Sequence, residues 1–258
     1  EYLQRNNLPE PIVDIQWSEQ AQFPNGSLNL VTAPRWFAMA GGLAVLNGPA
    51  ETHEAFFVAD LANQWLQDRA ADNEPFFLRV DPWGPHPPYV LDQESVGTVD
   101  PNTLPDYPNL TSSLEQRPQH HRDYRDEWHQ KTGFNTQQWK DMLARAIEHA
   151  NLVDRALGKL LDTLEQTGLI DNTAIFYTSD HGDIIGTNGG ASNKGAIMVE
   201  ENVRVPLAVQ LPQTLQQSQC NALVSNMDLF SSTLDLAGIS TPEDIISNSL
   251  CELCTSTE

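Results

Sequence analysis

The stretch from Tyr177 to Gly195, YTSDHGDIIGTNGGASNKG, concentrates groups that could hold a metal ion and an anion. Asp180 and His181 are adjacent, and a carboxylate beside an imidazole suits a divalent cation, with zinc or manganese more natural than calcium because of the nitrogen ligand. Gly182 would let the backbone turn both side chains toward one point. Lys194 follows a glycine-rich run and could bring its ammonium group close to an anionic ester. The alternative is a solvated loop, in which Asp180 caps the next segment and His181 is an ordinary polar residue.

A second candidate group is His86, in the sequence GPHPPY. Prolines on both sides restrict the backbone and therefore limit how far the imidazole can swing. A histidine held in this way could donate a hydrogen bond to an anion or a proton to a leaving group, although a structural role is the alternative. The histidine-rich segment at 119–131, QHHRDYRDEWHQK, has mixed charges and no recurring ligand spacing. It predicts a solvated surface segment.

The elements that must position these groups can be read from apolar patterns. Helical spacing of apolar residues predicts helices over three ranges, 54–70, 138–166 and 226–237, the last two ending at Gly168 and Gly238. Short apolar runs predict strands within 76–80, 173–180 and 203–212. Strands that alternate with helices favour an α/β fold with a mostly parallel central sheet flanked by helices. Ligands bind at the carboxyl ends of strands in such sheets, so the segments of His86 and Asp180, which both follow strands, are expected to meet.

Composition excludes several classes of partner. The 258 residues include 35 acidic and 14 basic side chains, a formal charge of -21, which makes nucleic acid and anionic membranes poor partners. A small anionic substrate remains compatible, because distant exposed charges are screened beyond about 8 Å. The longest nearly apolar run, 36–46, is far shorter than the roughly 20 residues of a membrane span, so no transmembrane helix is expected. The three cysteines do not make a complete disulfide framework, and plain thiols or a minor disulfide in the tail are expected.

Several segments, in their order along the chain, resemble the type I sulfatases of the alkaline phosphatase superfamily. The resemblance covers about residues 54–240 and is strongest in EPFFLRVDPWGPHPPY, GLIDNTAIFYTSDHGDIIG, NKGAIMVEENVRVPLAVQLP and SNMDLFSSTLDLAGI, with the helix at 144–169 also similar. It implies a metal-dependent sulfuric ester hydrolase acting on a small sulfated substrate, which could be a sulfated glycan. It also implies that Asp180 and His181 are metal ligands, that Lys194 and His86 hold the sulfate group, and that His86 assists the leaving oxygen. Members of the family commonly use calcium and are often exported, which favours a periplasmic or extracellular location.

The sequence departs from the family pattern in what it lacks. The family's nucleophile is a formylglycine made from Cys or Ser in the motif C/S-x-P/A-x-R, near an early Asp-Asp pair, and neither motif occurs in this sequence. We therefore expect residues 1–258 to be an N-terminally truncated, incomplete sulfatase catalytic domain that is inactive alone, with a polar surface excursion at 91–136 and a tail at 241–258. The alternatives are a phosphoester or phosphonate hydrolase of the same superfamily, or a non-catalytic module that binds sulfated glycans.

Overall fold

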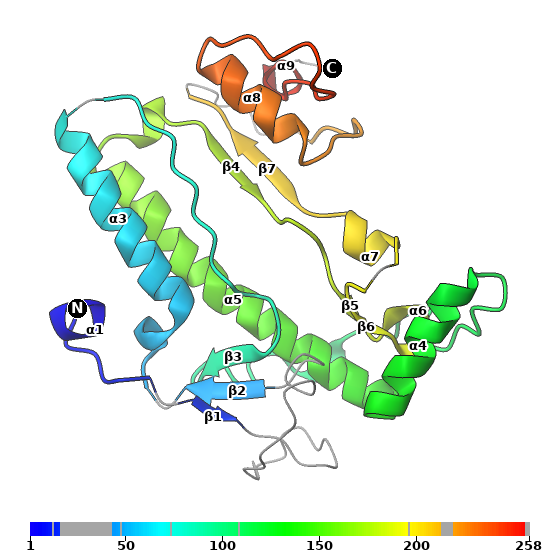
Figure 1. Cartoon of the computed structure of the whole chain (residues 1–258). Helices are drawn as coiled ribbons and strands as arrows, with labels where there is room; N and C mark the ends of the chain where they lie inside the picture. The colour runs from blue at the N-terminus through cyan, green and yellow to red at the C-terminus, as the bar shows by residue number, and fades with distance from the viewer. Residues whose placement is uncertain are drawn as a thin grey trace.

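The computed structural model describes residues 1–11, 13–15, 43–46, 48–72, 74–107, 109–195, 197–212 and 219–255. Its centre is formed by two long helices, α3 (Glu54–Asp72) and α5 (Thr136–Gln166), which lie side by side (Figure 1). Small side chains allow their close approach, and the buried contact consists of Ala55, Phe56, Ala59, Leu152, Val153 and Ala156. Both helices confirm the predictions from apolar spacing, to within two residues at each end.

The ends of α5 follow standard capping chemistry. At its start, the side chain of Asn135 accepts from the backbone of Gln138, and the Gln138 side chain accepts from the backbone of Asn135, a reciprocal capping box. At its end, Gly168 has a φ of +74°, and Leu169 N–H donates to Leu164 O at 2.9 Å. The expected stop at Gly168 is therefore confirmed, because glycine adopts this left-handed conformation at little cost.

The described strands form three small groups (Figure 1). One sheet has the order β1 (Val13–Ile15), β2 (Leu43–Leu46) and β3 (Tyr89–Asp92), with β1 antiparallel and β3 parallel to β2. The other groups are two antiparallel pairs. In these, β4 (Ile175–Thr178) pairs with β7 (Leu207–Gln210), and β5 (Ile184–Ile185) pairs with β6 (Ser192–Asn193).

The α/β class is confirmed, but the described strand pairings differ from the mostly parallel sheet that was expected. Only one of the four described pairings is parallel. The described part of the connection from β4 to β7 holds the β5–β6 pair and the four-residue helices α6 (Thr187–Gly190) and α7 (Glu200–Val203), and β7 returns beside β4 in the opposite direction. This connection has no long helix of the kind that usually forms a parallel crossover among its described residues. The segment 76–80, predicted as a strand, is extended without joining a described ladder.

The remaining described elements complete the chain. They are α1 (Tyr2–Arg5), η1 (Ala50–Thr52), η2 (Pro101–Thr103), α4 (Gln119–Thr132), η3 (Ile170–Asn172), α8 (Asp228–Leu236) and α9 (Cys251–Thr255). The predicted third helix is confirmed by α8, which is followed by Gly238 with a φ of +71°. No disulfide joins any of the three cysteines, all of which lie within the described residues. A search of the described residues finds no helix with the length and apolar character needed to cross a bilayer.

The segment at 119–131 lies largely at the surface, as its composition predicted, but the side chains of His121 and Trp128 are buried. It forms most of α4, and Trp128 on this helix is only 6% exposed. Trp128 packs against the part of the chain that precedes and follows Lys194, in a cluster with Ile184, Ala191, Ile197 and Val199. The range 91–136 therefore contains a helix that contributes to the core around the predicted site.

Candidate functional site

The exit of β4 places Asp180 and His181 at the surface, directly after the strand. Local hydrogen bonds shape this exit. Ser179 Oγ donates to His181 O at 2.7 Å, and Asn226 Nδ2 donates to Ser179 O at 2.7 Å. The Asp180 side chain is 82% exposed and that of His181 is 36% exposed, so both can be reached from solvent.

The orientation of His181 leaves one ring nitrogen available as a ligand. Its Nδ1 lies 2.8 Å from Gly182 O, and because a carbonyl only accepts, Nδ1 carries the proton. In the neutral ring Nε2 is then the nitrogen with a lone pair, and it lies 3.6 Å from Asp180 Oδ2. A carbonyl on the far nitrogen is the usual partner of a metal-binding histidine, so this pair fits a divalent cation. It is an incomplete donor set, since no group of three or more His, Cys, Asp or Glu among the described residues is arranged to hold a metal.

The structure brings Lys194 and His86 together. Lys194 Nζ donates to His86 Nε2 at 2.6 Å, and His86 Nδ1 donates to Pro87 O at 2.6 Å. Burial and the Lys194 cation both lower the pKa of His86, so the imidazole is neutral and its Nε2 faces the ammonium group. The rings of His86 and His181 have centroids 6.4 Å apart. All four side chains named from the sequence therefore lie in one cluster, as expected.

The backbone around Asp180 is held by a close approach that only glycine permits. Gly182 N–H donates to Asn202 O at 2.9 Å, and a Cβ on Gly182 would lie 1.9 Å from Glu201 O. From the sequence, Gly182 was expected to permit a turn of the backbone. The structure gives a different physical reason, which is direct contact between the backbone after β4 and the backbone of α7.

Asp183 is a site residue that the sequence argument did not select. Burial raises the pKa of its carboxyl to about 6, against opposing effects of Lys194 and His181. Its Oδ1 is buried and has no hydrogen-bond partner in the part of the chain that the structure describes. A signal was present in the sequence, because Asp183 is a second carboxylate three residues after Asp180 and is followed directly by the apolar Ile184, which is buried.

Helix α4 also contributes to the site in a way the sequence argument missed. Tyr124 Oη donates to Ser192 O at 2.6 Å, and His129 Nε2 donates to Gly189 O at 2.6 Å. Both acceptors belong to the glycine-rich stretch that leads to Lys194. The signal was present as the spacing of Tyr124 and Trp128, which are four residues apart on one face of an otherwise polar helix.

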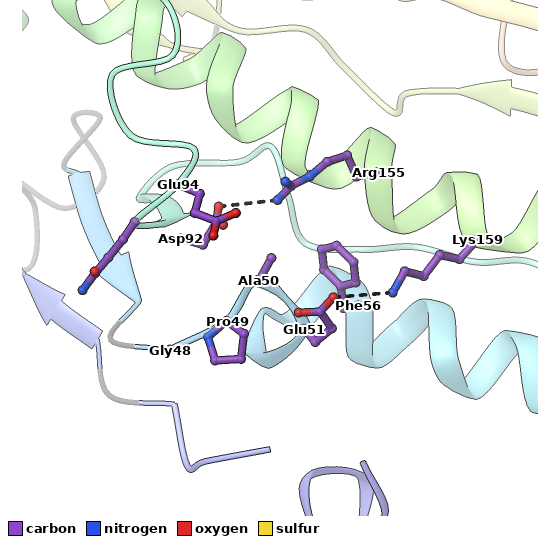
Figure 2. A pocket seen from close by; sticks show the side chains of 10 residues that line it. Gly48, Pro49, Ala50, Glu51, Phe56, Asp92, Glu94, Arg155 and Lys159 are labelled. Carbon is purple, nitrogen blue, oxygen red and sulfur yellow. Dashed lines mark hydrogen bonds and ion pairs between the residues drawn. The ribbon is translucent and has the colours of Figure 1, made fainter. Parts of the chain in front are cut away.

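A cavity of about 480 Å³ lies elsewhere, between α5, the start of α3 and the end of β3 (Figure 2). Arg155 points toward Asp92, with Nη2 3.5 Å from Oδ1, and Lys159 points toward Glu51, with 3.8 Å between Nζ and Oε1 (Figure 2). The cations of this cavity are thus already opposed by carboxylates, and none of the four predicted site residues lines it.

Comparison with known proteins identifies the family. A family model described as Sulfatase matches residues 16–239, which is most of the sequence. The chain belongs to the sulfatase family, as its resemblance implied. Enzymes of this superfamily generally depend on a metal ion.

Individual relatives agree with the family assignment. The ulvan-active sulfatase of Formosa agariphila is 27% identical over 204 residues, which are 78% of this chain and 36% of that protein. A phosphonate monoester hydrolase from Silicibacter pomeroyi superposes with a TM-score of 0.71 at 22% identity, over 80% of this chain and 42% of that one. A protein solved in complex with its substrate D-glucosamine-2-N,6-O-disulfate superposes with a TM-score of 0.63 at 22% identity. That superposition covers 80% of this chain and 52% of the other chain. The solved structures show the fold, and the chain spans only about a third to a half of these relatives.

Proposed function

We propose that the chain is the part of a sulfatase that contributes the anion-holding and part of the metal-binding groups, and that the complete enzyme hydrolyses a sulfate ester. The observation that carries this proposal is the contact of Lys194 Nζ with His86 Nε2 at 2.6 Å, beside Asp180 and His181 at the exit of β4. Membership of the sulfatase family supports the same reaction class. Sulfated glycans are the favoured substrate class, because the relatives include an ulvan-active sulfatase and a protein bound to a disulfated glucosamine.

Lys194 is the group that binds the sulfate oxygens. Its ammonium is partly buried and already points to the nitrogen of His86, so an anionic ester that enters the cluster meets an oriented cation. A cation at about 4 Å contributes about 4 kcal/mol at an effective dielectric constant near 20, more than the screened field of distant acidic residues. Preorganised charge of this kind stabilises the negative charge that develops in the transition state.

His86 orients the ester and handles the proton of the leaving group. With Nδ1–H held by Pro87 O, only Nε2 can exchange a proton with a bound substrate. Because burial and Lys194 lower the pKa of His86, the ring is neutral before the ester binds. An anion that draws the Lys194 ammonium away removes one of the groups that disfavours the imidazolium, so Nε2 can take a proton from solvent and then give that proton to the leaving oxygen, which returns His86 to its neutral form.

Two components come from outside the described groups. A divalent metal would stabilise the charge on the sulfuryl oxygens. Family members commonly use calcium, whereas the nitrogen ligand of His181 suits manganese or zinc. A formylglycine would supply the nucleophile. In this chain Asp180 and His181 would hold the metal, since Asp180 Oδ2 and His181 Nε2 lie 3.6 Å apart at the surface. This sequence contains no C/S-x-P/A-x-R motif, so the formylglycine is assigned to residues outside it.

The test is turnover by the natural full-length protein on matched esters, an aryl sulfate, an aryl phosphate and an aryl phosphonate monoester. We expect the largest kcat/KM for the aryl sulfate, and we expect Lys194→Ala to abolish turnover of that ester. A preference for the phosphonate would move the assignment to the alternative hydrolase class, whose cation chemistry is the same. Binding of a sulfated sugar without turnover of any ester would favour a non-catalytic glycan-binding module.

A further inference from the structure

Two buried histidines lie beneath the turn that presents His86. His53, at the start of α3, is 4% exposed, and His149, in the middle of α5, is 1% exposed. Their Nε2 atoms are 3.2 Å apart, and their ring centroids are 5.2 Å apart in an edge-to-face arrangement. Neither residue belongs to the cluster of Asp180, His181, Lys194 and His86, so their burial needs a separate explanation.

The proton on His53 is fixed by a backbone group. His53 Nδ1 lies 3.0 Å from the backbone nitrogen of Ala55, in the first turn of α3. A backbone N–H can only donate, so Nδ1 must be a bare acceptor and the ring proton must lie on Nε2. The imidazole thus acts as the N-cap of α3, in the place where Ser, Thr, Asp or Asn is usual. Its Nε2–H then lies 3.2 Å from His149 Nε2, and the backbone of Val90 also favours a proton on this ring.

The proton on His149 follows from that of His53. Nε2 of His149 accepts from His53 Nε2–H, so the proton of His149 is on Nδ1. Nδ1 has no hydrogen-bond partner of good geometry among the described residues, and the backbone of Pro85 is the group that most favours a proton on this ring. Each ring therefore has one defined tautomer. A second proton on either ring would place two N–H groups against each other or against Ala55 N–H.

The turn that presents His86 rests directly on His149. A Cβ on Gly84 would lie 2.5 Å from Val153 Cγ2 and 3.0 Å from His149 Nε2. The turn therefore approaches α5 more closely than it could with any residue other than glycine at position 84. The preceding residue, Trp83, is tied to the start of α3, because its N–H donates to Glu54 Oε1 at 2.9 Å. The turn is thus held between the first residues of α3 and the His149 side chain.

We infer that His53 and His149 form a neutral, tautomer-locked pair that positions the turn of His86 for contact with Lys194. The chain of contacts runs from Ala55 N–H through both imidazoles to the backbone of Gly84 and Pro85, and His86 follows directly. A leucine of similar size would fill the space at 149 but could not accept the His53 proton. This role of His149 as a positioning residue rests on the proposed function of His86, although the pairing itself can be measured without turnover.

The experiment is imidazole nitrogen NMR on the full 258-residue chain, with ¹⁵N-labelled histidine, between pH 6 and 8. We expect Nε2–H for His53, Nδ1–H for His149 and a single Nδ1–H tautomer for His86. In His149→Leu, we expect His86 to lose its single tautomer. His149→Gln should restore it, because the glutamine carbonyl can accept from His53 at the position of Nε2. Asn151→Leu, an exposed change two residues along α5, is the matched control and should leave His86 unchanged.

A second variant keeps the inference testable if His149→Leu does not fold. His53→Asn retains an acceptor for Ala55 N–H, but its shorter side chain places no donor at the position of Nε2 next to His149, so it should also release the tautomer of His86. The inference is overturned if His53 carries its proton on Nδ1, or if His86 keeps its single tautomer in a folded variant that lacks the pair. These outcomes do not depend on sulfate hydrolysis. In an active full-length enzyme, His149→Leu should lower kcat by about 10-fold to 100-fold and His149→Gln should restore it.

Discussion

Lys194 and His86 are 108 residues apart in the chain, yet Lys194 Nζ donates to His86 Nε2 at 2.6 Å. The contact joins the loop after β6 to the turn before β3. Each partner is also held by a second hydrogen bond. His86 Nδ1 donates to Pro87 O, and the backbone N–H of Lys194 donates to Asn193 Oδ1 at 2.7 Å. The ammonium and the imidazole are therefore oriented toward each other before any anion binds, which is the arrangement that electrostatic catalysis requires.

Replacing Lys194 by alanine should disable the full-length enzyme. Loss of one preorganised cation at the developing charge is expected to lower kcat/KM by about 10²-fold to 10³-fold. Lys159→Ala is the control, because Lys159 is an exposed lysine that faces Glu51 in the separate cavity of Figure 2. Steady-state kinetics on an aryl sulfate measure both variants. Near-normal turnover in Lys194→Ala would remove the assignment of this residue.

The same lysine should control the proton on His86. Since the Lys194 cation is one of the groups that lower the pKa of His86, Lys194→Met should raise that pKa. The effect can be measured in the 258-residue chain by NMR titration of the His86 ring, with no substrate present. An unchanged titration would mean that the contact is not maintained in solution.

A divalent cation should bind at Asp180 and His181. Removing the carboxylate ligand with Asp180→Asn is expected to weaken binding by about tenfold or more, on the scale seen for changes around metal ligands. His181→Asn should shift the preference from zinc and manganese toward calcium, because an amide oxygen replaces the imidazole nitrogen. Titration calorimetry with each metal tests both variants, and Asp171→Asn, an exposed change in η3, is the control. Equal affinity in Asp180→Asn and the unmodified chain would exclude this carboxylate as a ligand.

Adding a single methyl group at Gly182 should be strongly destabilising. A Cβ there would lie 1.9 Å from Glu201 O, and backbone cannot be displaced as a flexible side chain can. We expect Gly182→Ala to lower the free energy of unfolding by about 3 kcal/mol or more. Gly158→Ala is the opposite case, because Gly158 lies within α5 with nothing near its Cβ, and alanine should stabilise the helix by about 0.5–1 kcal/mol. Urea denaturation of both variants decides whether the site after β4 depends on this contact.

Stability should fall in mild acid because of the buried histidine pair. Burial lowers the pKa of His53 to about 4, against the raising effects of Asp92 and the Val90 backbone, and burial together with His53 lowers the pKa of His149 to about 3. Both values lie below the unfolded value near 6.5, so the unfolded chain binds more protons once the pH drops below about 6.5. The pair's contribution is complete above that pH. It is lost as the pH falls, with a slope of up to about 1.4 kcal/mol per pH unit for each proton.

This pH dependence can be isolated by substitution. Tyr89, whose ring centroid is 6.1 Å from that of His149, also faces the pair, but it stays neutral because burial raises its pKa well above the usual value. Urea denaturation between pH 7 and 5 should show a shallower loss of stability in His149→Gln than in the unmodified chain. Parallel pH profiles for the two proteins would contradict the assignment of the slope to this pair.

Local patterns in the sequence were sufficient to predict the main helices, the strand before Asp180 and the meeting of the segments of His86 and Asp180, whereas the roles of the four site residues stay predictions. The apolar stripe of α5, its stop at Gly168 and the strand at 175–178 depend on neighbours within a few turns, and such information is present in a linear chain. The matched family model covers residues 16–239, a range that contains most of the segments that carry the family resemblance.

Contacts between distant residues were decided only by the tertiary structure. The pairing of His53 with His149 across 96 positions, the packing of Trp128 near Lys194 and the burial of Asp183 have no local signature that specifies a partner. The reason given for Gly182 also differs from the one in the structure, since an added Cβ at this position would collide with the backbone of α7. The physical reason is that helix and strand periodicity reports which face is buried, whereas packing determines what that face meets.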